Sequence, residues 1–255
     1  MRWGCCTTVD NVGLLENVGY DYIELSMVSL ADDGQYERIE KAVEQSQLAV
    51  EVFNVFLPRH IKVVGPEIDQ DEIRNYVGKV IPRAAALGGK VIVFGSGQSR
   101  WVPDGFSKDR ARQQIIDFTK FLAEEVSRYG MEIGVEPLRS AECNLLKYVS
   151  EVYELVEKIG IDIVGVAADF YHITEGSEPL ENVVAASTRL KHIHLADSGR
   201  KWPGSGSYDY TAFFRRVKQA NYDQRMSIEC IWDDFSKNIK DALAFLKSTW
   251  DSVTV

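Results

Sequence analysis

The sequence predicts a single-domain (β/α)₈ barrel, the TIM barrel, in which eight parallel strands alternate with helices around a closed sheet. Short segments rich in β-branched residues alternate with longer amphipathic segments, and this alternation repeats eight times without a flexible linker. Barrels of about 255 residues fold as one unit, so we place no domain boundary within residues 1–255.

The expected strands are short and apolar, and some of them follow a glycine that ends the preceding helix. In AALGGKVIVF and SRYGMEIGVE, for example, glycine supplies the left-handed conformation that commonly closes a helix. The expected strands are 2–6, 22–25, 49–55, 90–95, 132–137, 164–169, 191–196 and 226–230.

The segments between these strands carry apolar residues at three- and four-residue steps, the spacing that gives a helix one apolar face. The expected helices are 10–18, 36–47, 70–87, 108–129, 149–160, 180–188, 209–219 and 236–250. Eight strand–helix units favour a closed barrel over an open doubly wound sheet. No GxGxxG motif follows the first strand, as it would in a dinucleotide-binding fold.

Composition and charge limit the classes of partner. The net charge is −9, whereas nucleic acids and anionic membranes are bound by clustered Lys and Arg, so we expect neither as a partner. No segment reaches the roughly 20 apolar residues of a membrane span, and the first ten residues lack the apolar core of a signal peptide. Four cysteines, two of them adjacent, do not form the spaced framework of a secreted disulfide protein. These features favour a soluble, cytoplasmic protein.

Four late strands carry a polar side chain at the carboxyl end, which is where barrels of this fold build their active sites. These residues are Glu136, Asp169, His194 and Glu229. Because side chains alternate along a strand, apolar neighbours such as Val135 face the helices. The four polar residues should therefore converge near the barrel axis.

Three carboxylates brought together in a partly desolvated barrel mouth would repel one another, and their pKa values would rise until some became protonated. A divalent cation removes this conflict. Three carboxylates and one imidazole suit Mn²⁺ or Mg²⁺ and could accept Co²⁺ or Zn²⁺. Taken singly, Asp169 could instead cap a helix and Glu229 could pair with Arg225, but neither alternative explains the whole set.

Several segments, in this order and spacing, resemble the xylose isomerase-like sugar phosphate isomerases and epimerases. The segments are FGSGQSRWVPDGFS, VEPL, ADFYH, HIHLADSGRKWPGSGSYDY and SIEC, and the resemblance covers nearly the whole chain. The nearest functional group is that of the ketose 3-epimerases acting on D-tagatose and D-psicose. The resemblance implies a small sugar or polyol substrate and one metal ion, most commonly Mn²⁺, held by the four strand-end residues. It also implies that Glu136 and Glu229 act as acid and base on the substrate.

The resemblance further assigns three residues to substrate binding. Glu142, His172 and Arg200 stand at the family's spacing after three of the strand-end residues. Without the resemblance they would be a loop carboxylate, a histidine capping a loop and an arginine paired with Asp197. Proteins of this family commonly form homodimers or homotetramers, so the resemblance allows either state, and the sequence does not choose between them.

The reaction that these residues predict is proton transfer next to a carbonyl, through an enediolate that the metal stabilises. Returning the proton to the opposite face of the same carbon epimerises the sugar, and returning it to the adjacent carbon isomerises it. Dehydration of an inosose-type ketone begins with the same enolisation and is the alternative reaction. A sugar-binding barrel without catalysis is the non-enzymatic alternative, against which the intact Glu136 and Glu229 argue.

Three further features stand outside the predicted site. His192, two residues before His194, is expected in the barrel core or beside the metal ligands rather than on the metal. Glu24 ends the second strand and could either line the pocket or orient a neighbour. The segment WPGSGSYDY could cradle a phosphate, but only Arg200 and Lys201 add positive charge nearby. A free sugar, a sugar acid and a sugar phosphate all stay open as substrates.

Overall fold

The computed structural model describes residues 1–255 and contains a closed barrel of eight parallel strands in chain order. The strands are β1 (Arg2–Cys6), β2 (Tyr22–Ser26), β3 (Ala49–Asn54), β4 (Val91–Phe94), β5 (Glu132–Val135), β6 (Val164–Asp169), β7 (Leu190–Leu195) and β8 (Arg225–Ile228). Strand β8 pairs with β1, so the sheet has no open edge. The predicted fold class is confirmed, and each predicted strand overlaps an observed one.

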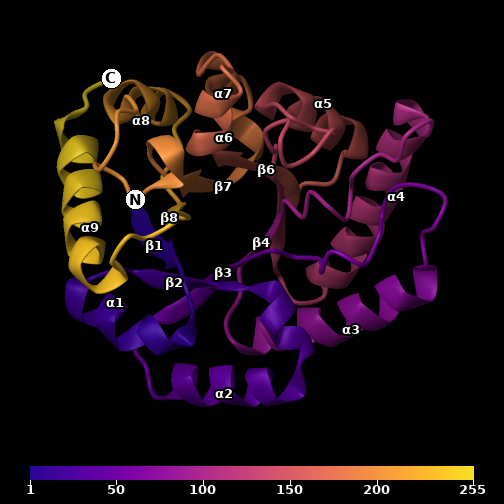
Figure 1. Ribbon diagram of the computed structural model, residues 1–255, viewed down its shortest axis with the longest axis horizontal. Helices are drawn as coiled ribbons and strands as arrows, with labels where there is room; N and C mark the ends of the chain where they lie inside the picture. Colours follow the sequence, from indigo (N-terminus) through magenta and orange to yellow (C-terminus); the bar gives the residue numbers. More distant parts are fainter.

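Helices form an outer ring around the barrel (Figure 1). They are α1 (Val12–Val18), α2 (Asp33–Glu44), α3 (Gln70–Ala86), α4 (Lys108–Ser127), α5 (Val149–Ile159), α6 (Phe170–Glu175), α7 (Glu181–Ala185), α8 (Tyr210–Gln219) and α9 (Phe235–Ser252). The helix expected at 180–188 is shorter, because α7 is followed by a separate 3-10 turn at Ser187–Arg189. Helix α6 was not predicted, since its six residues make fewer than two turns and show no periodicity.

Side-chain alternation along the strands divides the buried apolar residues into two groups. Most of them form one core between the sheet and the helices, and Ile133 and Val135 of β5 belong to it. A smaller group fills the inside of the barrel with Tyr22, Val52, Val91, Val93 and Ala167. These apolar side chains occupy part of the barrel interior. The inward-facing polar side chains are therefore found toward the ends of the strands.

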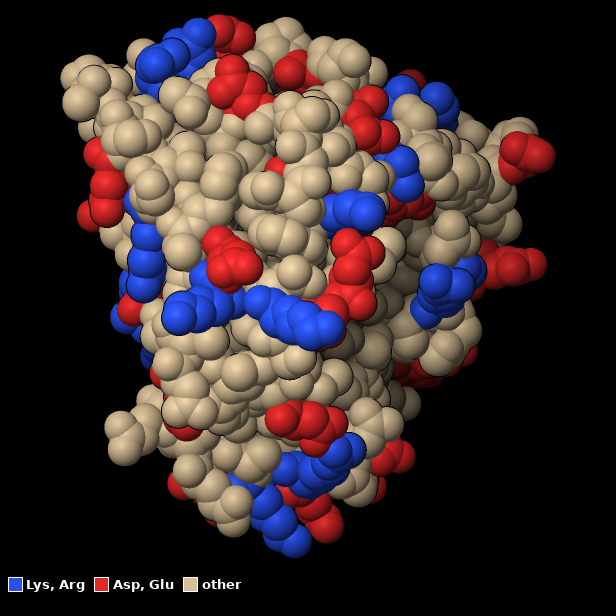
Figure 2. Space-filling view, turned by 60° about the vertical axis from the view of Figure 1, so that its left-hand side comes forward, with Lys and Arg blue, Asp and Glu red and all other residues tan.

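The surface shows no segregation of charge on the face drawn in Figure 2, where acidic and basic side chains lie interspersed. None of the helices is both long enough and apolar enough to pass through a bilayer.

Candidate metal centre and active site

The carboxyl ends of β5 to β8 bring the four predicted ligand residues together. Glu136 and Glu229 directly follow β5 and β8, Asp169 ends β6, and His194 lies within β7. One nitrogen or oxygen from each residue can be chosen so that the four atoms lie within 4.8 Å of one another. The structure thus has the convergence that strand alternation predicts, and metal binding by these residues stays a prediction.

The barrel backbone holds these residues in place. Asp169 of β6 is the ladder partner of His194 of β7. The amide of Glu136 donates to the carbonyl of Phe94 at 3.1 Å, and the amide of Glu229 donates to the carbonyl of Leu195 at 3.0 Å. Because hydrogen bonds of the sheet fix the backbone of these residues, their side chains extend from rigid backbone positions.

Asp169 has two roles, one for each carboxylate oxygen. Its Oδ1 accepts hydrogen bonds from the amides of Tyr171 at 2.7 Å and His172 at 3.2 Å, which caps α6. Its Oδ2 faces the cluster and lies 3.3 Å from a guanidinium nitrogen of Arg200. Asp169 is therefore both the helix cap that the sequence allowed and a member of the predicted cluster.

Glu24 of β2 is fully buried and holds both histidines of β7. The Nε2 atom of His194 lies 2.8 Å from Oε1 of Glu24, and Nε2 of His192 lies 3.0 Å from Oε2. Burial raises the pKa of Glu24, but the two histidines outweigh it and hold this pKa below its ordinary value. Glu24 thus orients its neighbours and does not line the pocket, a choice that the sequence left open.

This contact determines which nitrogen of His194 is available to a metal ion. With Nε2 bonded to Glu24, Nδ1 faces the cluster, 2.9 Å from Oε1 of Glu136 and 3.5 Å from Oε2 of Glu229. A carboxylate on the second ring nitrogen is the usual support of a metal-binding histidine. His192 lies one layer deeper in the barrel core and is fully buried, in agreement with its expected place.

The charges of the cluster fit a divalent cation. The cluster contains the carboxylates of Glu136, Asp169 and Glu229, and the buried carboxylate of Glu24 lies beside it on His194. One guanidinium, that of Arg200, contacts Asp169 and Glu229. Burial raises the pKa of Glu229, although His194 and Arg200 act in the opposite direction. Burial lowers the pKa of His194, but Glu24 and Glu229 outweigh it and hold this pKa well above its ordinary value. Both pKa shifts favour the protonated forms of Glu229 and His194, because the cluster carries excess negative charge. A divalent ion bound there would supply positive charge in place of these protons.

We expect Glu24→Gln to lower the affinity for Mn²⁺ by about 10- to 100-fold in a folded protein. Each histidine meets a different oxygen of Glu24, and glutamine replaces one of these oxygens by an NH₂ group and removes the negative charge, so the support for the ring of His194 is weakened. Isothermal titration with Mn²⁺ measures the affinity, and circular dichroism checks the fold. Glu132→Gln is the matched control, since Glu132 lies at the opposite end of the barrel and pairs with Lys191. Unchanged affinity in Glu24→Gln would show that Glu24 does not support the ligand.

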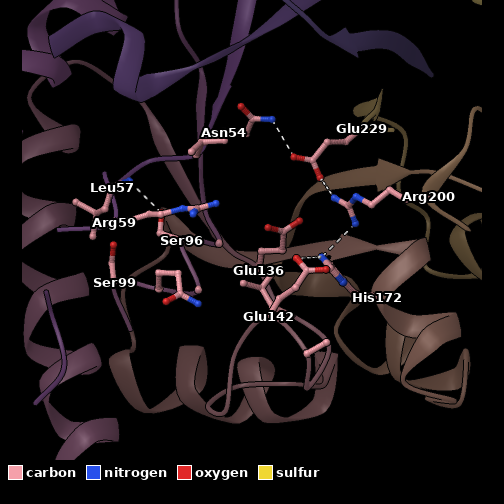
Figure 3. Close-up of a pocket in the computed structure, with 16 residues that line it drawn as sticks. Asn54, Leu57, Arg59, Ser96, Ser99, Glu136, Glu142, His172, Arg200 and Glu229 are labelled. Atoms are coloured by element: carbon pink, nitrogen blue, oxygen red, sulfur yellow. Dashed lines mark hydrogen bonds and ion pairs between the residues drawn. The ribbon is translucent and has the colours of Figure 1, made fainter. Parts of the chain in front are cut away.

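A cavity of about 330 Å³ borders this cluster at Glu136 and Glu229, and Figure 3 shows residues that line it. The three predicted substrate-binding residues, Glu142, His172 and Arg200, all line it, together with Glu136 and Glu229. The volume lies at the lower end of the roughly 300–1,000 Å³ found for small-molecule sites. Glu136 and Glu229 therefore belong to both the cluster and the pocket wall.

Arg200 links the pocket to the cluster. One of its nitrogens lies 3.3 Å from Oδ2 of Asp169 and 3.3 Å from Nε2 of His172, and the other forms an ion pair with Glu229. The Nε2 atom of His172 lies 3.9 Å from Oε2 of Glu142. Arg200 thus faces the site, and its alternative pairing with Asp197 is not found.

Asp197 is instead surrounded by the glycine-rich segment 202–210 and its neighbours. Its carboxylate accepts hydrogen bonds from the amides of Ser198 at 2.7 Å, Gly204 at 3.0 Å and Tyr208 at 3.0 Å. These amides already bind an anionic group of the chain itself, and no residue of 202–210 lines the cavity. This geometry does not support a phosphate cradle at WPGSGSYDY.

The sequence reasoning missed two residues that hold the catalytic glutamate candidates. Asn54, the last residue of β3, donates from Nδ2 to Oε1 of Glu229 at 3.0 Å. Arg100 is fully buried and donates to the backbone carbonyl of Glu136. The strand-end rule could have found Asn54, whereas Arg100 lies in the loop after β4 and gives no such signal.

The pocket wall also contains backbone strain. Val55, Ser96 and Arg200 adopt positive φ values of 43°, 39° and 58°, and all three line the cavity. This conformation is unfavourable for side-chain-bearing residues, above all for β-branched ones, and persists where the surroundings enforce it. Such strain is concentrated at functional sites, which supports this pocket as the site.

A closed barrel with a buried carboxylate–histidine cluster beneath a polar pocket defines a TIM barrel of the type that builds its site at the strand ends. The profile of the xylose isomerase-like TIM barrel family matches residues 12–249. The chain belongs to this family.

Relatives of the chain include sugar epimerases and inosose isomerases. The 3-dehydro-D-guloside 4-epimerase of Escherichia coli K12 is 23% identical over 245 residues, which cover 92% of each chain. The inosose isomerase of Bacillus velezensis is 22% identical over 280 residues, covering 97% of this chain and 94% of the relative. These identities are too low to transfer a particular activity.

Solved structures show the same fold. D-psicose 3-epimerase in the presence of D-fructose superposes with a TM-score of 0.87 at 15% identity, covering 98% of this chain and 99% of that chain. The IolI protein with a bound zinc atom superposes with a TM-score of 0.73 at 18% identity, covering 98% and 96%. At these identities the likeness extends to the fold alone.

Proposed function

We propose that the protein is a metal-dependent sugar epimerase or isomerase that moves a proton on a ketose or sugar phosphate through an enediolate. One observation carries this proposal: Glu136 and Glu229 border the pocket and also belong to the buried cluster with Asp169 and His194. Carboxylates at a metal site and within reach of substrate are the groups that such a proton transfer needs. The sugar epimerases and isomerases among the relatives support the same class.

The ion would be held by the carboxylates of Glu136, Asp169 and Glu229 and by Nδ1 of His194. This mainly hard donor set favours Mn²⁺, with Mg²⁺, Co²⁺ or Zn²⁺ also accepted. A divalent ion bound there supplies Lewis acidity, which stabilises negative charge on a ketose carbonyl and the neighbouring hydroxyl.

The two glutamates would divide the proton transfer between them. They come from β5 and β8, which are separated in the barrel by β6 and β7, so they reach a substrate carbon from different directions. One carboxylate removes the proton as the base, and the other donates a proton as the acid. Asn54 holds one oxygen of Glu229, while Oε2 of Glu136 lies against Gly95, where a Cβ atom would overlap it.

The remaining polar residues of the pocket would position the substrate. Arg200 presents N–H groups that can bind substrate oxygens, and the imidazole of His172 can accept from or donate to a substrate hydroxyl according to its tautomer. Glu142 can accept hydrogen bonds from hydroxyls near the carbonyl. Holding the reacting carbon between two fixed carboxylates lowers the entropic cost of the reaction.

Hydrogen exchange from deuterated solvent tests this proposal. The protein with Mn²⁺ is incubated with a panel of ketoses and ketose phosphates, and NMR follows deuterium at each carbon. Exchange at C3 with inversion supports epimerisation, and exchange at C1 or C2 supports isomerisation. Loss of water would replace the proposal by the inosose-type dehydration, and binding without any exchange would replace it by a sugar-binding barrel.

A further inference from the structure

We propose that the substrate carries an anionic group, a phosphate or a carboxylate, at the end remote from the reacting carbon, and that Arg59 binds this group. This inference rests on the proposed function, because it takes the same pocket as the substrate site. It narrows the substrate from sugars in general to acidic sugars.

Arg59 is the arginine of the pocket wall that no carboxylate neutralises. The cavity is lined by two arginines, Arg59 and Arg200. Arg200 forms ion pairs with Asp169 and Glu229, whereas no ion pair of the protein includes Arg59. Figure 3 shows Arg59 on the side of the pocket opposite Arg200, with its guanidinium directed toward the cavity and Glu136 between the two arginines.

The backbone before and after Arg59 is fastened to the loop that follows β4, and after Arg59 the amide of Val63 donates to the carbonyl of Ser99 at 2.9 Å. The amide of Leu57 donates to Oγ of Ser96 at 2.9 Å, and Oγ of the buried Ser99 donates to the carbonyl of Pro58 at 3.1 Å. These bonds join residues 57–63 and 95–99 into one wall, which we call the Arg59 wall. Arg59 is exposed, and it extends into the pocket from a wall that these hydrogen bonds hold in place.

A lysine strengthens this wall without competing for a ligand. Nζ of Lys62 donates to the carbonyl of Arg59 at 2.7 Å and to the carbonyl of Gln98 at 3.0 Å. The ammonium of Lys62 therefore serves to join the two segments and adds positive potential on the same side of the pocket. The guanidinium of Arg59 is left as the group that can contact a substrate.

The other charged residues of the pocket determine the orientation of an anionic substrate. Glu136, Glu142 and Glu229 lie toward the metal cluster and would repel an anionic group. Arg200 is neutralised by its own partners, and the amides around Asp197 already bind a carboxylate. An anionic substrate would therefore place its charge at Arg59 and its carbonyl at the glutamates. A guanidinium suits phosphate and carboxylate because it binds both through paired N–H groups.

Binding measurements on Arg59→Met test the inference. Isothermal titration in saturating Mn²⁺ compares three probes: D-fructose, D-fructose 6-phosphate and 5-keto-D-gluconate. We expect the wild type to bind at least one anionic probe more tightly than D-fructose. Arg59→Met should weaken that probe by about 10- to 100-fold, the loss typical of a hydrogen bond to a charged group, and leave D-fructose within about twofold. The anionic probe that loses affinity identifies phosphate or carboxylate.

Two further variants complete the design. Arg59→Lys should recover part of the lost affinity because it keeps the charge, and Arg215→Met, which removes an exposed arginine of α8, should bind all probes as the wild type does. Equal binding of all three probes by the wild type, or an equal loss for neutral and anionic probes in Arg59→Met, would overturn the inference. Isothermal titration measures binding independently of hydrogen exchange. If Arg59 makes binding depend on the charge of the probe but no exchange occurs, the proposed reaction is refuted and the anion site is supported.

Discussion

Glu136→Gln and Glu229→Gln should each lower the rate of hydrogen exchange between substrate and solvent by about 10²- to 10⁴-fold, while the barrel stays folded. Each substitution removes one of the two carboxylates that border both the cavity and the cluster. The amide of glutamine neither accepts nor donates the transferred proton. NMR in deuterated solvent measures the exchange, and Glu132→Gln is the matched control on β5, away from the site.

Metal binding and proton transfer by these glutamates can be separated with Asp169→Asn. Asp169 belongs to the cluster but does not line the cavity, so it is expected to hold the ion without moving a proton. Exchange by Asp169→Asn should recover as Mn²⁺ is raised, whereas that of the two glutamine variants should not. Wild-type exchange in either glutamine variant, or recovery of all three variants by Mn²⁺, would contradict the acid and base roles.

Removal of the ion should inactivate the protein and also destabilise it. At a Mn²⁺ concentration 100 times Kd, binding stabilises the folded state by about 2.7 kcal/mol, which corresponds to a Tm increase of roughly 5 to 10 °C at this chain length. Thermal unfolding with and without EDTA measures the change, and added Mn²⁺ should restore both Tm and activity. Full activity with a metal content near zero after dialysis against EDTA would contradict the metal dependence.

The fold could be predicted from the sequence because the eightfold alternation is a local pattern repeated along the whole chain. Short helices contain too few residues to show the apolar periodicity on which the prediction depends. Helix α6 escaped prediction because Asp169, rather than an apolar period, starts it. Side-chain alternation also predicted correctly that His192 lies in the barrel interior.

The candidate site was only partly predictable. Position at a strand end pointed to the four members of the cluster, but it does not reveal which side chains contact them. Glu24 meets His194 from 170 residues away in the sequence, so only the closed barrel makes this contact visible. Arg59 lies beyond the end of β3 in an irregular loop, and its place in the pocket depends on bonds to the loop after β4. No local pattern encodes such a contact between loops.

The most direct test is a crystal structure of the protein grown with Mn²⁺, with an anomalous difference map. We predict one strong peak per chain, bonded to carboxylate oxygens of Glu136, Asp169 and Glu229 and to Nδ1 of His194, with Nε2 of His194 still on Glu24. A map without a peak among these residues, or with the ion between Glu24 and His192 instead, would contradict the account.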